Sequence, residues 1–304
     1  MSLWPAFVAG GILVLGAVMF STKAIMVKLA LPYGVAPTSL LLLRLIFAAP
    51  FYLAILLWIK LRTANSEPLQ PHLFKVILLG FVGYYLASYF DFVGLSYITA
   101  GLERVILYAY PTLVLLISAV ALGKKISLHQ MVAVALCYLG IFIAIRFGDS
   151  ESFEGLWLGA FLVFLSALAY AIYLVGSGEL IPKLGVWLFT SCAMLVSFVC
   201  VVIHHLILPP STISIMALPW QVYGYALAMA IFATVIPSFL ISEGIKRIGA
   251  SNASIIGGVG PISTIVLASI FLGEAFTMPQ AIGTAVVIGG VIYISVNMKQ
   301  ENRP

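Results

Sequence analysis

Five charged residues lie inside long apolar segments of this sequence, where ionised side chains are rare: Lys23, Arg44, Asp91, Glu103 and Arg104. A charged side chain at the centre of a bilayer costs on the order of 2.5–3.5 kcal/mol on insertion scales, so each needs a partner or a function. Three of the five are cations, which bind carboxylates through charge-assisted hydrogen bonds. The chemistry that these residues predict is therefore the binding of a carboxylate or another anion.

The helical rise places all five residues toward one side of a bilayer. At about 1.5 Å per residue, Lys23 lies about 28 Å along the first segment and Arg44 about 10 Å into the second. Asp91 is near the end of the third segment, and Glu103 and Arg104 begin the fourth. In the alternative interpretation, Arg44 and Arg104 pair with Asp91 and Glu103 to hold helices together, and Lys23 extends its amine to the interface. The sequence leaves both open.

Aromatic and neutral polar residues supply further candidates. Tyr85, Tyr89 and Tyr108 lie deep in their segments, and Tyr85 and Tyr89 are one helical turn apart on one face. They predict a cavity wall that stacks on a flat or cationic substrate, with plain packing as the alternative. Candidates from the second half, each of which could instead form a packing hydrogen bond, are Tyr170, Tyr173, Thr234, Asn252 and Ser254.

The composition indicates which elements must position these residues. Of 304 residues, 63% are hydrophobic and 8% are charged, against about 25% charged in soluble domains. A bilayer core of about 30 Å needs roughly 20 apolar residues per helix, and the segments do not alternate in polarity as barrel strands do. We therefore expect an all-α integral membrane protein. The ten predicted segments are 5–30, 37–59, 72–94, 101–122, 128–146, 155–177, 185–207, 220–242, 251–272 and 278–298.

Lysine and arginine in the loops predict the orientation, because these residues are enriched on the cytoplasmic side. With the N-terminus inside, the opposite side holds Lys28, Arg104 and Arg146. The cytoplasmic side holds Lys60, Arg62, Lys75, Lys124, Lys125, Lys183, Lys246, Arg247, Lys299 and Arg303. Both termini are predicted to be inside.

The sequence also repeats at an offset of 150 residues, with residues 94–140 matching 244–290 without a gap. The shared pairs include Pro111/Pro261 and Gly140/Gly290, whereas Lys124 is replaced by Glu274. Each half, 1–147 and 148–304, has five segments, so the second half enters the membrane from the opposite side. The change from a positive charge at Lys124 to a negative charge at Glu274 then follows the positive-inside rule. The repeat is therefore predicted to be inverted.

Two stretches carry a resemblance to a known family, YITAGLERVILYAYPTLVLLISAVALGKKISLHQ (97–130) and IGASNASIIGGVGPISTIVLASIFLGEAFTMPQ (248–280). The chain resembles the drug/metabolite transporter superfamily in its EamA-like branch. The resemblance implies ten helices, a central cavity lined by helices one to four and six to nine, and helices five and ten set apart. In that family a glutamate is common at the loop positions that correspond to 124 and 274. Lys124 departs from this pattern, and we interpret the departure as a consequence of the membrane topology.

An inverted repeat allows the halves to exchange conformations and so to alternate access to a midplane cavity. The sequence thus predicts a secondary transporter in the inner (plasma) membrane that exports or exchanges small organic metabolites such as amino acids. Alternatives are a membrane-embedded enzyme, a non-transporting scaffold or a channel. No phosphate-binding loop or metal-ligand pair is present in the sequence, which disfavours ATP-driven transport. We expect no catalytic residue, cofactor or metal. Expected partners are a small-molecule substrate and the lipid bilayer, no nucleic acid, and a homodimer as an open alternative.

The predicted topology can be tested with reporters fused to either end of the chain. Because each half has five segments, both ends are predicted to lie in the cytoplasm. A reporter that is active only in the cytoplasm should therefore be active at either end. Ends on opposite sides of the bilayer would contradict the inverted repeat.

Overall fold

The computed structural model describes residues 4–62, 69–122, 127–147, 155–209, 214–275 and 277–301, and within these ranges it contains helices and no strand. The α-helices are α1 Trp4–Ala30, α2 Pro37–Arg62, α3 Leu73–Leu79, α4 Ala87–Gly94, α5 Ala100–Leu107, α6 Tyr110–Leu122, α7 Leu128–Phe147, α8 Leu156–Leu184, α9 Val186–Ile207, α10 Trp220–Ala230, α11 Ile236–Ile256, α12 Val259–Leu272 and α13 Met278–Glu301. Short 3₁₀ turns are η1 Leu31–Tyr33, η2 Gln70–His72 and η4 Ile215–Ala217, and π-helical segments are η3 Gly80–Leu86 and η5 Ile231–Val235.

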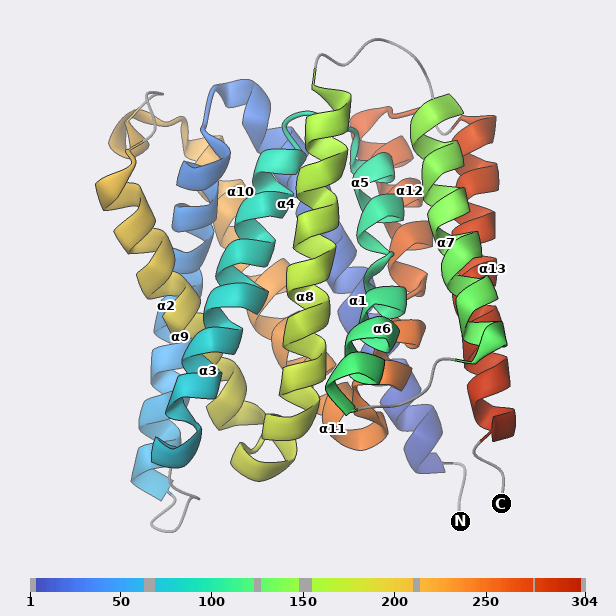
Figure 1. Ribbon diagram of the computed structural model, residues 1–304. Coiled ribbons are helices and arrows are strands. Elements are labelled where there is room, and N and C mark those ends of the chain that lie inside the picture. Colours follow the sequence, from blue (N-terminus) through green and yellow to red (C-terminus); the bar gives the residue numbers. More distant parts are fainter. Residues whose placement is uncertain are drawn as a thin grey trace.

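Eight stretches of the described chain are long and apolar enough to cross a membrane. Two shorter apolar helices, Val259–Leu272 and Met278–Tyr293, follow them. The all-helical prediction is confirmed, whereas ten crossings and cytoplasmic termini stay predictions. Helix α1 begins and α13 ends at the same end of the bundle (Figure 1). Lys124 and Lys125 lie outside the described residues.

Two predicted segments that we expected to be continuous are broken in the middle. The segment 101–122 divides into α5 and α6, and 251–272 divides into the end of α11 and α12. Pro111 and Pro261 lie in the first turns of α6 and α12, where the missing N–H of proline leaves no intrahelical bond unmade. The mid-span prolines thus mark new helix starts, not bends within one helix.

Two other predicted boundaries were wrong because polar residues continue a helix. The predicted segment 155–177 extends as α8 to Leu184, and ion pairs from Glu179 to Lys75 (3.0 Å) and Lys183 (3.3 Å) support its last turns. Helix α11 likewise passes the predicted end at 242, interrupted by Gly249 with φ 79°. Glycine adopts this left-handed conformation without the steric cost of a side chain.

The irregular segments recur at the offset of 150 residues. The π-helical segments η3 and η5 occupy equivalent positions, and so do the breaks between α5 and α6 and between α11 and α12. In η5, the Thr234 hydroxyl donates to the Met229 carbonyl at 2.9 Å and so partners a backbone acceptor in the irregular turn. Packing partners recur as well, because α1 contacts α11 and α12 as α8 contacts α4 and α6.

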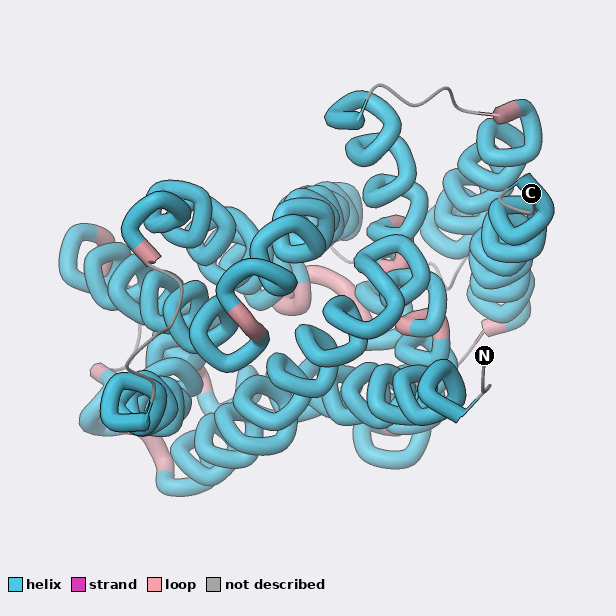
Figure 2. Tube along the Cα trace, turned by 90° about the horizontal axis from the view of Figure 1, so that it is seen from below, coloured by secondary structure: helices cyan, strands magenta, loops and turns pink. Residues whose placement is uncertain are grey.

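Helices α7 and α13 form an antiparallel pair at one side of the bundle (Figures 1 and 2). Their backbones approach closely at Gly140 and Gly283, since a Cβ on Gly283 would lie 2.5 Å from the Gly140 carbonyl oxygen. Small residues permit this approach in lipid, where van der Waals packing drives helix association. The placement agrees with the family resemblance, which implied that these two helices stand apart.

The contacts between α7 and α13 recur when each residue is replaced by its counterpart 150 positions away in the sequence. The counterpart of the glycine contact is Gly290 against Ala133, where a Cβ on Gly290 would lie 3.0 Å from the Ala133 carbonyl oxygen. Cys137 and Val287 are equivalent positions and touch each other, with Cys137 Sγ 3.6 Å from the Val287 carbonyl oxygen. A pair of equivalent residues in mutual contact is what a local two-fold relationship produces.

The tight glycine contact predicts an asymmetric response to two substitutions in α13. Gly283→Ala should lower the melting temperature in detergent by several degrees, because overpacking costs about 1–3 kcal/mol. Gly289→Ala is the matched control, since a Cβ there meets nothing within 4 Å. Equal melting temperatures for the two variants would contradict this packing.

Candidate functional site

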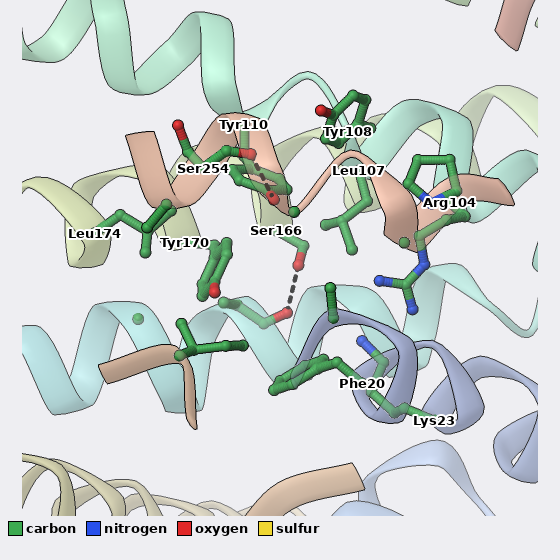
Figure 3. A pocket seen from close by; sticks show the side chains of 18 of the residues that line it. Phe20, Lys23, Arg104, Leu107, Tyr108, Tyr110, Ser166, Tyr170, Leu174 and Ser254 are labelled. Atoms are coloured by element: carbon green, nitrogen blue, oxygen red, sulfur yellow. Dashed lines mark hydrogen bonds between the residues drawn. The ribbon is translucent and has the colours of Figure 1, made fainter. Parts of the chain in front are cut away.

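A cavity of about 90 Å³ lies between the two halves of the chain. Its walls come from α1, η3, α4, α5 and α6 of the first half and from α8, α11 and α12 of the second. Since one water molecule needs roughly 10–15 Å³ of cavity volume measured in this way, the cavity can hold several water-sized groups. Figure 3 shows the nitrogen atoms of Lys23 and Arg104 at one end and Tyr170 and Leu174 at the other.

The polar end of the cavity is one face of a buried ion cluster. Lys23 Nζ lies 2.5 Å from Asp91 Oδ2 and 3.9 Å from Glu103 Oε1, and Arg104 Nε lies 3.4 Å from Glu103 Oε2. Lys23 and Arg104 line the cavity, whereas the two carboxylates lie behind them and are 1% and 0% exposed. The four formal charges sum to zero. The cluster joins α1, α4 and α5.

Several atoms of this cluster lack a hydrogen-bond partner among the described residues. Arg104 Nη2 is one of them, on a side chain that lines the cavity and is 8% exposed. The carboxylates of Asp91 and Glu103 are instead engaged by the ion pairs with Lys23 and Arg104. An unsatisfied buried polar group costs about 1–3 kcal/mol. A ligand oxygen in the cavity would satisfy the Arg104 donor.

Arg44 lies behind the cavity wall. Its Nη2 donates to Ser88 Oγ at 3.0 Å, and its guanidinium carbon lies 4.9 Å from the centroid of the Phe92 ring. Ser88 lines the cavity, so Arg44 is connected to the cavity through this hydroxyl. Including Arg44, the five predicted charges sum to +1.

The alternative interpretation, in which ion pairs of Arg44 and Arg104 hold the helices together and Lys23 reaches the interface, was partly wrong. Arg104 lies beside Glu103 as expected, but none of the ion pairs among the described residues involves Arg44. Lys23 does not extend to the interface, because it is 5% exposed and bound to Asp91. The physical reason is that two buried carboxylates compete successfully with water for its ammonium group.

The two helix breaks meet at the cavity. The Tyr108 hydroxyl donates to the Ile255 carbonyl at 3.0 Å. The Tyr110 hydroxyl donates to the Ser254 carbonyl at 3.1 Å, a bond that Figure 3 shows. These carbonyls lie in the last turn of α11, where a helix has fewer intrahelical donors for its acceptors, and the Ile255 carbonyl also accepts the Gly258 N–H at 3.0 Å. Tyrosines that flank the first break thus satisfy the backbone at the second.

Gly257 and Gly258 make this contact sterically feasible. A Cβ at Gly257 would collide with the Tyr110 hydroxyl, and one at Gly258 with the Tyr108 hydroxyl. Small residues such as these generally permit close helix approach. They admit aromatic side chains from the other half, which sequence spacing alone could not reveal.

Tyr85 and Tyr89 do not line the cavity. They pack together, with ring centroids 6.3 Å apart, against His204 of α9. The Tyr85 hydroxyl lies 2.7 Å from His204 Nδ1. Helical periodicity put the two tyrosines on one face, but it could not say which neighbour that face meets.

The remaining candidates from the second half have separate environments. Tyr173 is buried, with its hydroxyl 2.8 Å from that of Tyr84 and its ring stacked on Tyr170 at 6.0 Å. Asn252 is exposed and donates to the Ile248 carbonyl at 2.9 Å. Of the thirteen candidates from the sequence, the cavity lining includes Lys23, Arg104, Tyr108, Tyr170 and Ser254. Phe20 and Ser88 also line it, and no sequence signal marked them.

A model of the EamA-like transporter family matches residues 9–146 and, a second time, residues 157–296. The chain belongs to the EamA-like transporter family. It is 32% identical over 289 residues to "Uncharacterized transporter YcbK" of Bacillus subtilis (strain 168), covering 94% of this chain and 91% of that protein. It is 24% identical over 204 residues to "Uncharacterized inner membrane transporter YicL" of Salmonella typhimurium, covering 67% of each chain.

A solved crystal structure has the same fold as this EamA-like protein. The two superpose with a TM-score of 0.67 over 97% of this chain and 99% of the other, at 17% sequence identity. Together with the apolar helices, the family membership identifies a multi-pass membrane protein of a transporter family. The two matches of one family model show that the chain contains two copies of the same unit.

The ion cluster predicts a strong dependence of stability on Lys23. Lys23→Met should lower the melting temperature in detergent by on the order of 10 °C, because breaking a buried ion pair costs about 3–5 kcal/mol. Adding Asp91→Asn should recover part of this loss, since it removes the uncompensated carboxylate.

The matched control for this variant is Lys75→Met. Lys75 pairs with Glu179 at 3.0 Å, but both side chains are about half exposed, so the substitution should cost at most about 1 kcal/mol. Strictly additive losses in the Lys23 and Asp91 double variant would show that the two residues are not coupled.

Proposed function

We propose that this EamA-like protein is a secondary transporter for a small organic metabolite that carries a carboxylate, such as an amino acid or a related compound. The observation that carries the proposal is the pair of buried cations, Lys23 and Arg104, at one end of a cavity between the two halves. Arg104 brings a donor with no partner among the described residues. The proposed direction is export or exchange across the inner membrane, a location also named for the Salmonella relative.

The charge of the site favours a ligand with one negative charge at this end. The two cations that line the cavity are already balanced by Asp91 and Glu103, and Arg44 behind Ser88 adds one positive charge. A planar guanidinium binds a carboxylate with two parallel hydrogen bonds, which a point charge cannot do. The proposed roles are therefore direct binding by Arg104 and Lys23, and support through Ser88 by Arg44.

The aromatic end of the cavity suits the body of an organic metabolite. Tyr110 lies edge to face with Tyr108 and with Tyr170, at centroid distances of 5.6 and 5.2 Å. Rings in such arrangements contribute about 0.5–1.5 kcal/mol beyond the burial of their area, and they accept flat apolar groups. Leu174 adds apolar surface at this end, and Phe20 adds apolar surface beside Lys23. A ligand with a carboxylate at one end and an apolar or flat group at the other matches both ends.

Alternating access between inverted halves is the proposed mechanism. Support comes from the two matches of the family model, from the recurring helix breaks and from the two-fold contacts between α7 and α13. Discontinuous helices that meet at a site between repeats are typical of secondary transporters. The two halves would rock about this site and expose it first to one side and then to the other.

A ligand panel tests the proposal. Small monocarboxylates and amino acids, their methyl esters and the matching amines would be screened by thermal stabilisation, and each hit would be followed as flux into proteoliposomes. At least one carboxylate should stabilise and cross, and its ester should do neither. Arg104→Gln should weaken its binding by about 10- to 100-fold, because a hydrogen bond to a charged group contributes about 1.5–3 kcal/mol.

Arg146→Gln is the matched control, because Arg146 lies on α7 beside Phe147 and does not line the cavity. Flux that persists unchanged in the Arg104 variant would remove Arg104 from the site. A panel in which no carboxylate stabilises the protein would end the proposal of an anionic substrate.

A further inference from the structure

The loop after α12 contacts the first residues of α5. Glu274 Oε1 accepts a hydrogen bond from the Ala100 N–H at 2.9 Å, and Oε2 accepts one from the Gly101 N–H at 3.1 Å. The first amides of a helix have no intrahelical acceptor and lie at the positive end of its dipole. A carboxylate that accepts from two of them makes charge-assisted bonds.

The end of α12 determines where this carboxylate lies. Gly273 has φ 66°, a left-handed conformation that glycine adopts without strain, and it ends the helix. The N–H groups of Gly273 and Glu274 both bond to the Ala268 carbonyl, the latter at 3.3 Å. The chain therefore turns sharply after α12 and directs Glu274 toward α5.

This contact joins the two halves beside the ion cluster. Glu274 belongs to the second half, whereas α5 belongs to the first and carries Glu103 and Arg104 on its next turn. Lys28 of α1 is within electrostatic range of both Glu274 and Glu103. The contact lies at the end of the bundle opposite to the start of α1 and the end of α13 (Figure 1), which is the predicted outer side.

We propose that Glu274 is an outer latch, a contact that holds the two halves together on the outer side and must release before the cavity opens outward. The inference rests on the proposed transport function. Because α5 also carries Arg104, closing the latch fixes the helix that presents the cavity cation. Glu274 thus acts through α5 and does not itself bind the substrate.

The sequence indicates that only one of the two halves can form this contact. At the offset of 150 residues, the position of Glu274 is occupied by Lys124, which lies outside the described residues. A lysine cannot accept hydrogen bonds from backbone amides. Contact with a helix N-terminus is thus available to the acidic residue of one half and not to its basic counterpart.

The test measures access to the cavity from outside, without a substrate. Ala17→Cys places a reporter on the cavity wall, in a background that carries Cys137→Ala, Cys192→Ala and Cys200→Ala. A membrane-impermeant maleimide is then applied to right-side-out vesicles. Glu274→Gln should raise the initial labelling rate about tenfold, because the neutral amide loses the charge-assisted contact with α5.

Glu179→Gln is the matched control, because it also neutralises a glutamate that bonds other residues. Glu179 binds Lys75 and Lys183 near the end of α8, at the opposite end of the bundle, so its variant should label at the unmodified rate. Glu274→Asp keeps the charge on a shorter side chain and should give an intermediate rate. It also provides a second test if Glu274→Gln does not fold.

Two results would overturn the latch: an unchanged labelling rate in a folded Glu274 variant, or equal acceleration in the Glu179 variant. Acceleration in inside-out vesicles alone would also overturn it, because the contact would then lie on the inner side. Labelling requires no substrate. Faster labelling in a protein that transports no carboxylate would therefore support the latch and reject the proposed function.

Discussion

Balancing ionised groups away from water is the constraint on which the rest of this structure depends. Lys23 binds Asp91 and approaches Glu103, and Arg104 lies beside the same glutamate, so every charge of this set has an opposite charge within 4 Å. A charge deprived of its partner in a low-dielectric interior is strongly destabilising. The cluster therefore fixes how α1, α4 and α5 pack. Because its two cations also form the end of the cavity, the same interaction that holds the first half together would, on the proposed function, present the cations to an anion.

The second requirement is that the backbone N–H and C=O groups are hydrogen-bonded within the protein, since lipid offers no hydrogen bonds to an interrupted helix. The protein interrupts two helices at equivalent positions, and it places both interruptions against each other and not against lipid. Tyr108 and Tyr110 donate to the carbonyls that the second break exposes, and Gly257 and Gly258 leave room for them. The irregular backbone of these two breaks thus lies at the wall of the cavity.

Part of this arrangement was predictable from the sequence. The all-helical architecture followed from composition and apolar length, and the helical rise placed Lys23, Asp91, Glu103 and Arg104 toward one side while leaving open whether they pair. Pro111 and Pro261 recur at the 150-residue offset, but both segments were expected to be continuous, because a proline in a continuous apolar run does not distinguish a bend from a new helix start. Tyr85 and Tyr89 were correctly placed on one face, yet the neighbour of that face depends on helix rotation within the bundle. Ser88 was not anticipated, because its role depends on Arg44 from another helix.

The tyrosine contacts across the breaks have no mirror image in the repeat. Tyr108 corresponds to Gly258 and Tyr110 to Gly260, so a shape exchange between the halves cannot rebuild the same bonds on the other side. On the proposed cycle, the inward-facing and outward-facing forms therefore differ in free energy and are unequally populated at rest. A passive carrier still follows its gradients. Its half-saturating concentration nevertheless differs between the two faces, since apparent affinity scales with the fraction of protein in the competent form.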